Sequence, residues 1–210
     1  MNCMKDFLLR RLGESREQTM KENKKLYKFL KTIYSKLLKI LYKPTAYGTE
    51  NIPKEGPIIF VGNHRHAFDP IVVMTHTNRM LHYMAKESLF KGIHGKLFES
   101  IGLIKVHRNK SNPMAIIEAQ EILQQGGAVG IFPEGTRNRT DQELLPFRHG
   151  AVAIAKETNS KIIPFAIKGK YRLFKKGLSI EFGKPVDVSQ MEIEEANDYI
   201  RNEVLNIFRK

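Results

Sequence analysis

Short apolar runs alternate with helical stretches along most of this chain, and that alternation constrains its fold most strongly. The runs that predict strands are 58–61, 82–85, 103–106, 128–132, 162–167 and 178–182. The stretches with helical periodicity are 70–77, 88–101, 113–125, 151–158 and 192–208. Strands that alternate with helices predict an α/β fold, a single domain with a central mixed sheet flanked by helices. A length of 210 residues suits one such domain.

The N-terminal segment has a different pattern. Residues 20–43 hold eight lysines and one acid, Glu22. At 100° per residue most of these lysines fall on one arc, and leucine, isoleucine, phenylalanine and tyrosine fill the opposite side. Neither glycine nor proline interrupts the segment before Pro44. We therefore predict a basic amphipathic helical segment within residues 1–45, followed by an α/β domain over 46–210.

Two roles are open for this helix. It could pack on its own domain with a solvated lysine face, or it could lie in a bilayer surface with its lysines at anionic headgroups. The net charge of +13 favours an anionic partner, and no nucleic-acid-binding signature accompanies the lysines. No apolar run reaches the ~18 residues of a membrane span, and the first residues do not resemble a secretory signal. We expect a protein on the cytoplasmic face of the membrane, peripheral or monotopic.

The first candidate site follows the strand at 58–61 and reads Gly-Asn-His-Arg-His-Ala-Phe-Asp-Pro. His64 and Asp69 would lie about 140° apart on a straight helix, so they meet only if a turn separates them. An imidazole can accept a hydroxyl proton at neutral pH, and a carboxylate can orient it. Alternatively, Asp69 caps a helix that begins at Pro70. His64 and His66 suggest a metal only weakly, because no third ligand stands out, and the single cysteine, Cys3, rules out a Cys-rich zinc site.

The second candidate site leaves the strand at 128–132 and reads Phe-Pro-Glu-Gly-Thr-Arg, with further basic residues close behind: Arg139, Arg148 and His149. The arginine fork matches phosphate oxygens, and a glycine turn lets backbone N–H groups approach an anion. The simpler alternative is a charged turn with an internal Glu134–Arg137 pair.

These motifs together resemble the glycerolipid acyltransferase superfamily. Asn63-His64-x4-Asp69 resembles its first signature block, and the run Phe132, Pro133, Glu134, Gly135, Thr136, Arg137 resembles its third. The intermediate and later blocks are matched by these residues: Lys86 to Phe90, Gly102-x5-Arg108, Phe147 to Ala151 and Ile163 to Phe165. By size and motif the chain is most similar to bacterial 1-acyl-sn-glycerol-3-phosphate (lysophosphatidate) acyltransferases. The resemblance covers about residues 46–170 and implies a glycerol-3-phosphate acyltransferase-like fold.

The resemblance also implies a reaction in phospholipid biosynthesis. A fatty acyl chain would pass from acyl-CoA or acyl-acyl carrier protein to the sn-2 hydroxyl of lysophosphatidate, forming phosphatidate without a cofactor. His64 would act as the base and Asp69 would orient it. Lys86 and backbone N–H groups around Gly135 are the oxyanion candidates. The acceptor phosphate would be held by Arg108 and Arg137, with Glu134 fixing an arginine or a glycerol hydroxyl.

Other functions stay open at this point. A sibling acyltransferase could use another lysophospholipid or glycerol 3-phosphate, and a non-catalytic lipid-binding protein could keep the same fold. The expected partners are lysophosphatidate, an acyl thioester, an anionic membrane surface and an acidic acyl carrier protein, with no nucleic acid and no metal. The sequence does not reveal the acyl-chain length, the donor or the oligomeric state.

Overall fold

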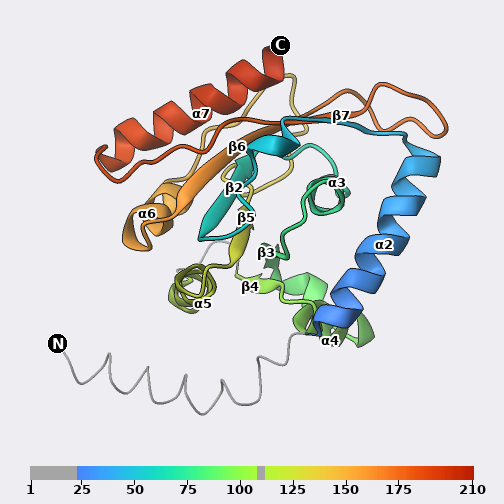
Figure 1. Cartoon of the computed structure of the whole chain (residues 1–210), viewed down its shortest axis with the longest axis horizontal. Helices are drawn as coiled ribbons and strands as arrows, with labels where there is room; N and C mark the ends of the chain where they lie inside the picture. The colour runs from blue at the N-terminus through green and yellow to red at the C-terminus, as the bar shows by residue number, and fades with distance from the viewer. Residues whose placement is uncertain (1–22, 108–111) are drawn as a thin grey trace.

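The computed structural model of the chain describes residues 23–107 and 112–210, and these form one mixed sheet of seven strands (Figure 1). Its strands are β1 (Thr45–Tyr47), β2 (Ile58–Gly62), β3 (Leu81–Lys86), β4 (Ile104–Val106), β5 (Ala128–Ile131), β6 (Lys161–Lys168) and β7 (Ser179–Phe182). Their spatial order is β1-β7-β6-β2-β5-β3-β4. Neighbours are parallel from β6 to β4, whereas β7 runs antiparallel to β6 and parallel to β1.

Helices cover both faces of the sheet, which confirms the predicted fold class (Figure 1). The helical elements are α2 (Lys24–Leu41), η1 (Thr49–Asn51), α3 (Asp69–Thr75), η2 (Glu87–Phe90), α4 (Ile93–Ser100), α5 (Pro113–Gln124), α6 (Gly150–Glu157) and α7 (Ile193–Arg209). Helices α5, α6 and α7 share one core cluster, and α2 and α3 contribute to the other.

The strand sequences explain why both faces are covered. Along β2, Ile59 and Val61 enter the core under α5, α6 and α7, whereas Ile58 and Phe60 enter the core under α2 and α3. All five residues of β2 are buried. Side chains of a strand alternate between the faces, so a continuous apolar run requires a layer of helices on each side.

The structure departs from the predicted elements at two places. The helix predicted over 88–101 is divided into η2 and α4, because Gly92 has a φ of +68°. Strand β1 was not predicted, since three residues with alternating exposure carry no apolar run. It begins at Thr45, at the end of the predicted N-terminal segment.

Helix α2 lies against the domain along one side and exposes apolar residues along another. It begins after Asn23, whose side chain accepts a hydrogen bond from the Leu26 N–H. Tyr27 and Leu38 are 5% exposed, and the Tyr27 hydroxyl accepts a hydrogen bond from the N–H of Leu81. Burial raises the pKa of Tyr27 to about 12. The helix thus packs on the domain while its opposite side stays open to solvent.

The open side of α2 is strongly apolar. Its exposed large side chains are Phe29 (62%), Ile33 (44%), Leu37 (46%) and Ile40 (61%). Exposed lysines border this stripe, so α2 packs on its own domain and leaves an amphipathic surface open. In the described part of the chain, no helix has the length and apolar character needed to cross a bilayer.

Substitution of Gly130 tests how tightly the sheet is packed. A Cβ atom at Gly130 would lie 2.2 Å from the ring of Tyr83, its cross-strand partner. We expect Gly130→Ala to lower the free energy of unfolding by about 1–3 kcal/mol in urea denaturation, because the buried ring has to move. Gly150→Ala is the matched control, because nothing lies within 4 Å of its added Cβ. Equal stability of the two variants would contradict the expectation.

Candidate active site

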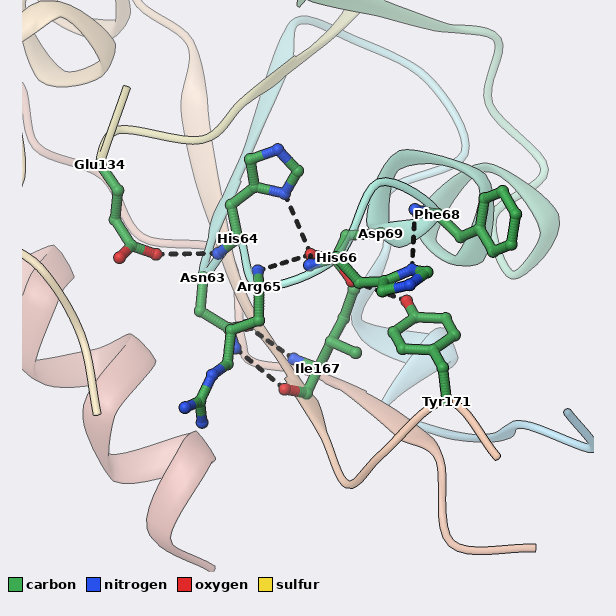
Figure 2. Close-up of polar contacts among 9 residues, drawn as sticks. All are labelled: Asn63, His64, Arg65, His66, Phe68, Asp69, Glu134, Ile167 and Tyr171. Carbon is green, nitrogen blue, oxygen red and sulfur yellow. Dashed lines mark hydrogen bonds and ion pairs between the residues drawn. The ribbon is translucent and has the colours of Figure 1, made fainter. Parts of the chain in front are cut away.

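The candidate site lies where three adjacent parallel strands end. Strand β2 has β6 on one side and β5 on the other, so the loops that follow them meet at one edge of the sheet. Asn63 fixes the first of these loops. Its Nδ2 donates to the carbonyl of Ile167 (2.9 Å) and its Oδ1 accepts from the N–H of Ile167 (2.8 Å) (Figure 2). Asn63 is therefore paired with the end of β6 like a peptide group, which holds the next residue in place.

The loop after β2 brings His64 and Asp69 together. The Nδ1 atom of His64 lies 3.0 Å from Oδ2 of Asp69. The carboxylate is 1% exposed and the imidazole 16%. Figure 2 shows the second ring nitrogen of His64, Nε2, on the ring edge that faces away from Asp69. The predicted turn between the two residues is present.

Asp69 accepts hydrogen bonds from four donors. Besides His64, its Oδ2 atom accepts from the backbone N–H groups of Arg65 and His66, each at 2.7 Å, and its Oδ1 accepts from the Tyr171 hydroxyl at 2.6 Å. With donors on both oxygens the carboxyl group is held as an acceptor. In a neutral His64 imidazole this contact favours the tautomer with the proton on Nδ1 and the lone pair on Nε2.

The alternative interpretation of Asp69 as a helix cap is wrong. Helix α3 begins at Asp69 itself, its cap position is Phe68, and no side chain caps it. The carboxylate is directed back to the loop before the helix because the N–H groups of that loop lie within reach.

Sequence reasoning missed Tyr171. It lies in the connection between β6 and β7, 102 residues from Asp69, and no motif marks it. Burial and the neighbouring Asp69 charge raise the pKa of its hydroxyl, which keeps the donor proton in place. Its ring stacks on His66 at 4.0 Å between centroids. The imidazole of His66, the second histidine of this loop, is therefore packed on Tyr171.

The loop after β5 supports His64 from the other side. Phe132 stacks on the His64 ring with centroids 4.3 Å apart and an interplanar angle of 24°. Glu134 is 4% exposed, and its two carboxylate oxygens accept from the N–H groups of His64 (2.8 Å) and Leu145 (2.9 Å). The N–H of Asn138 donates to the carbonyl of His64 at 2.7 Å. Ring, amide and carbonyl of His64 are all fixed by this loop.

The hydrogen-bond partners of Glu134 differ from those that we predicted. We expected it to fix an arginine or a glycerol hydroxyl, but both of its oxygens hold backbone N–H groups. Burial raises the pKa of this carboxyl, and the two N–H donors act against that rise. Glu134 therefore links the loop after β2 to residue 145 across the site.

The rest of the motif that follows β5, residues 132–137, forms a tight turn. Gly135 has a φ of +66°, and its N–H donates to the carbonyl of Phe132 at 3.0 Å. That amide is engaged within the turn, so Gly135 itself is not a free oxyanion donor, contrary to its candidacy. Pro133 is buried, and its carbonyl accepts from the N–H of Arg148 at 3.0 Å. Thr136 and Arg137 follow the turn on the surface.

Lys86 and Arg108 are the remaining predicted residues. Lys86 is the exposed last residue of β3, and β5 separates that strand from β2. Arg108 is outside the described residues; β4, the next strand outward, ends at Val106. In the part of the chain that the structure describes, no group of three or more His, Cys, Asp or Glu is placed to hold a metal ion.

Comparison with known proteins identifies the family of this chain. A family model described as Acyltransferase matches residues 43–168, which is more than half of the chain. The chain belongs to the Acyltransferase family. The matched span includes His64, Asp69 and the motif of residues 132–137.

Relatives within the Acyltransferase family share most of the chain. A 1-acyl-sn-glycerol-3-phosphate acyltransferase of Bacillus subtilis is 30% identical over 167 residues, covering 77% of this chain and 82% of the relative. One of Borreliella burgdorferi is 29% identical over 168 residues, covering 77% and 67%. The crystal structure of the 1-acyl-sn-glycerophosphate acyltransferase PlsC from Thermotoga maritima matches with a TM-score of 0.69 and 26% identity, over 91% of this chain and 83% of PlsC.

The Tyr171 hydroxyl offers a test of how Asp69 is oriented. We expect Tyr171→Phe to lower kcat for acyl transfer roughly tenfold with little change in KM, because it removes one donor but keeps the ring on His66. Steady-state kinetics alongside a thermal melt would measure both effects. Tyr42→Phe is the matched control, since Tyr42 packs edge-on to Tyr171 in the same aromatic cluster. Unchanged kcat in Tyr171→Phe, or an equal loss in both variants, would exclude a positioning role.

Proposed function

We propose that this acyltransferase transfers a fatty acyl chain from an acyl thioester to the sn-2 hydroxyl of 1-acyl-sn-glycerol 3-phosphate, forming phosphatidate. The observation that carries the proposal is the 3.0 Å contact between His64 Nδ1 and Asp69 Oδ2, which directs the lone pair of Nε2 away from the carboxylate. The names of the bacterial relatives support lysophosphatidate as the acceptor.

The His64 imidazole acts as the general base. Its Nε2 takes the proton of the sn-2 hydroxyl while that oxygen bonds to the thioester carbonyl carbon, and the carbonyl electron pair moves to oxygen. Asp69 stabilises the imidazolium that forms. When the tetrahedral intermediate collapses, the carbon–sulfur bond breaks and the imidazolium returns its proton to the leaving thiolate. His64 serves first as base and then as acid. No acyl-enzyme is needed, because the acceptor hydroxyl attacks the thioester directly.

The developing oxyanion and the acceptor phosphate need cationic or N–H partners. Lys86 and the amides beside Gly135 remain the oxyanion candidates, although the Gly135 N–H is itself engaged. Arg137 and Arg108 are assigned to the phosphate. Arg148 supports this side of the site, because its guanidinium lies against Gly135, where a Cβ atom would be 2.9 Å from its Nε. The donor is proposed to be acyl-CoA or acyl-acyl carrier protein.

Lipid substrates require access from a bilayer surface. We assign this contact to α2, within the N-terminal segment 1–45, because its apolar stripe is exposed and bordered by lysines. Anionic lipids would hold the lysines, which would place the enzyme peripherally at the cytoplasmic face of the membrane.

Replacement of His64 tests the reaction. We expect His64→Ala to lower phosphatidate formation from lysophosphatidate and long-chain acyl-CoA by about 100-fold or more, because the general base is lost. Thermal denaturation checks that the variant is folded. A folded wild-type protein without product in this assay, with acyl-acyl carrier protein and with other lysophospholipids would contradict the proposed function.

Charge reversal on α2 tests the membrane contact. We expect Lys25, Lys36 and Lys39 changed together to glutamate to abolish most binding to vesicles that contain phosphatidylglycerol, because repulsion replaces attraction. These lysines are exposed, so the melting temperature should hardly change. Vesicle sedimentation measures the binding, and an unchanged bound fraction would be evidence against the contact.

A further inference from the structure

The loop of residues 169–177, within the connection between β6 and β7, carries a feature that the site does not explain. It reads Gly-Lys-Tyr-Arg-Leu-Phe-Lys-Lys-Gly, with four basic residues and no acid. At its tip Leu173 is 57% exposed and Phe174 63% exposed. Two adjacent large apolar side chains in water, ringed by cations, are typical of segments that enter a lipid interface.

The backbone holds these two side chains outward at a cost. The N–H of Lys175 donates to the carbonyl of Arg172 at 3.2 Å, which closes a β-turn with Leu173 and Phe174 at its centre. Phe174 has a φ of +61°, a conformation for which such turns normally use Gly or Asn. An aromatic residue at this position gains no burial within the described protein in return. A strained residue of this kind points to a partner outside the chain.

The neck of the loop is closed, which keeps the tip projecting. Gly169 and Gly177 both have positive φ, and a Cβ atom at Gly169 would lie 1.7 Å from the carbonyl oxygen of Gly177. Only glycine permits this approach of the two backbones. The seven residues between them therefore extend as one closed loop.

The loop continues the exposed apolar stripe of α2. The N–H of Phe174 donates to the carbonyl of Leu41, the last residue of that helix, at 2.5 Å. The rings of Tyr42 and Tyr171 meet edge-on with centroids 5.4 Å apart. Figure 1 shows the loop and the C-terminal end of α2 at the same side of the molecule. A partner surface that contacts the loop therefore also contacts the C-terminal end of α2.

We propose that the 169–177 loop is a second lipid-contacting element, which inserts Leu173 and Phe174 among the acyl chains of an anionic leaflet. The partner of this loop is a bilayer, because the tip projects two apolar side chains and forms no groove. The four cations of the loop complement headgroup phosphates. The inference rests on the proposed function in one respect, since an enzyme that acylates a lipid works at such a surface.

The loop also sets where the dyad lies relative to the membrane. Tyr171, two residues before Leu173, donates to Asp69 and stacks on His66. Insertion of the tip would hold His64 close to the headgroup layer. The hydroxyl of an acceptor lipid could then reach Nε2 while its acyl chain stays in the bilayer.

The test is a double variant, Leu173→Ser with Phe174→Asn. Asparagine accepts a positive φ, so the turn is kept and only the apolar tip is removed. We expect the partition coefficient onto vesicles of equimolar phosphatidylglycerol and phosphatidylcholine to fall roughly tenfold, by sedimentation. The matched control is Met114→Ser with Tyr199→Ser, two comparably exposed side chains (47% and 44%) on α5 and α7, across the sheet from α2. Its partitioning should equal that of the wild type.

A second measurement separates binding from chemistry. With short-chain lysophosphatidate and acyl-CoA below their critical micelle concentrations, the tip variant should keep the wild-type rate, whereas His64→Ala should lose it. Wild-type partitioning by the tip variant overturns the proposal, and loss of binding to acyl carrier protein alone would assign the loop to that protein. Failure of the wild type to form phosphatidate refutes the proposed function but leaves the vesicle result decisive for the loop.

Discussion

The burial of the Asp69 carboxylate is the constraint on which the rest of the site depends. A carboxylate that is 1% exposed loses its hydration and needs donors in return. Those donors come from the loop after β2 and, through Tyr171, from the connection after β6. The aspartate can be buried only when both segments are in place. The replacement of its water by protein donors therefore occurs together with the assembly of the site.

A second buried carboxylate extends the same principle across the site. Glu134 joins the amide of His64 to that of Leu145, so the loop after β5 cannot move independently of the histidine. Phe132 adds a stacked ring beneath the imidazole, and Tyr83 stacks on Phe132 in turn at 5.9 Å. The direction of Nε2 is therefore determined by the contact with the Asp69 carboxylate, by the stacked rings and by the hydrogen bonds that hold the backbone of His64.

Much of the fold follows from the sequence because the central strands β2, β5 and β6 are largely apolar runs, which require burial on both faces. The proximity of His64 and Asp69 was also predictable, since the six residues between β2 and α3 leave room for one turn. Tyr171 was not, because nothing local marks a residue 102 positions away as a donor to Asp69. The partners of Glu134 were hidden for a related reason: they are backbone amides, which every sequence contains. Lys86 and Arg137 are exposed, so the fold alone does not dictate where their cations lie.

The reversal of β7 against β6 has a topological consequence. Had the chain entered another parallel strand after β6, it would have crossed to the opposite edge of the sheet through a helix over one face. Because the next strand is antiparallel, the chain turns back at the edge where it left, and the turn itself becomes available to the site. A single change in strand direction thus converts what would be a covering helix into a loop that reaches both the aspartate and the molecular surface.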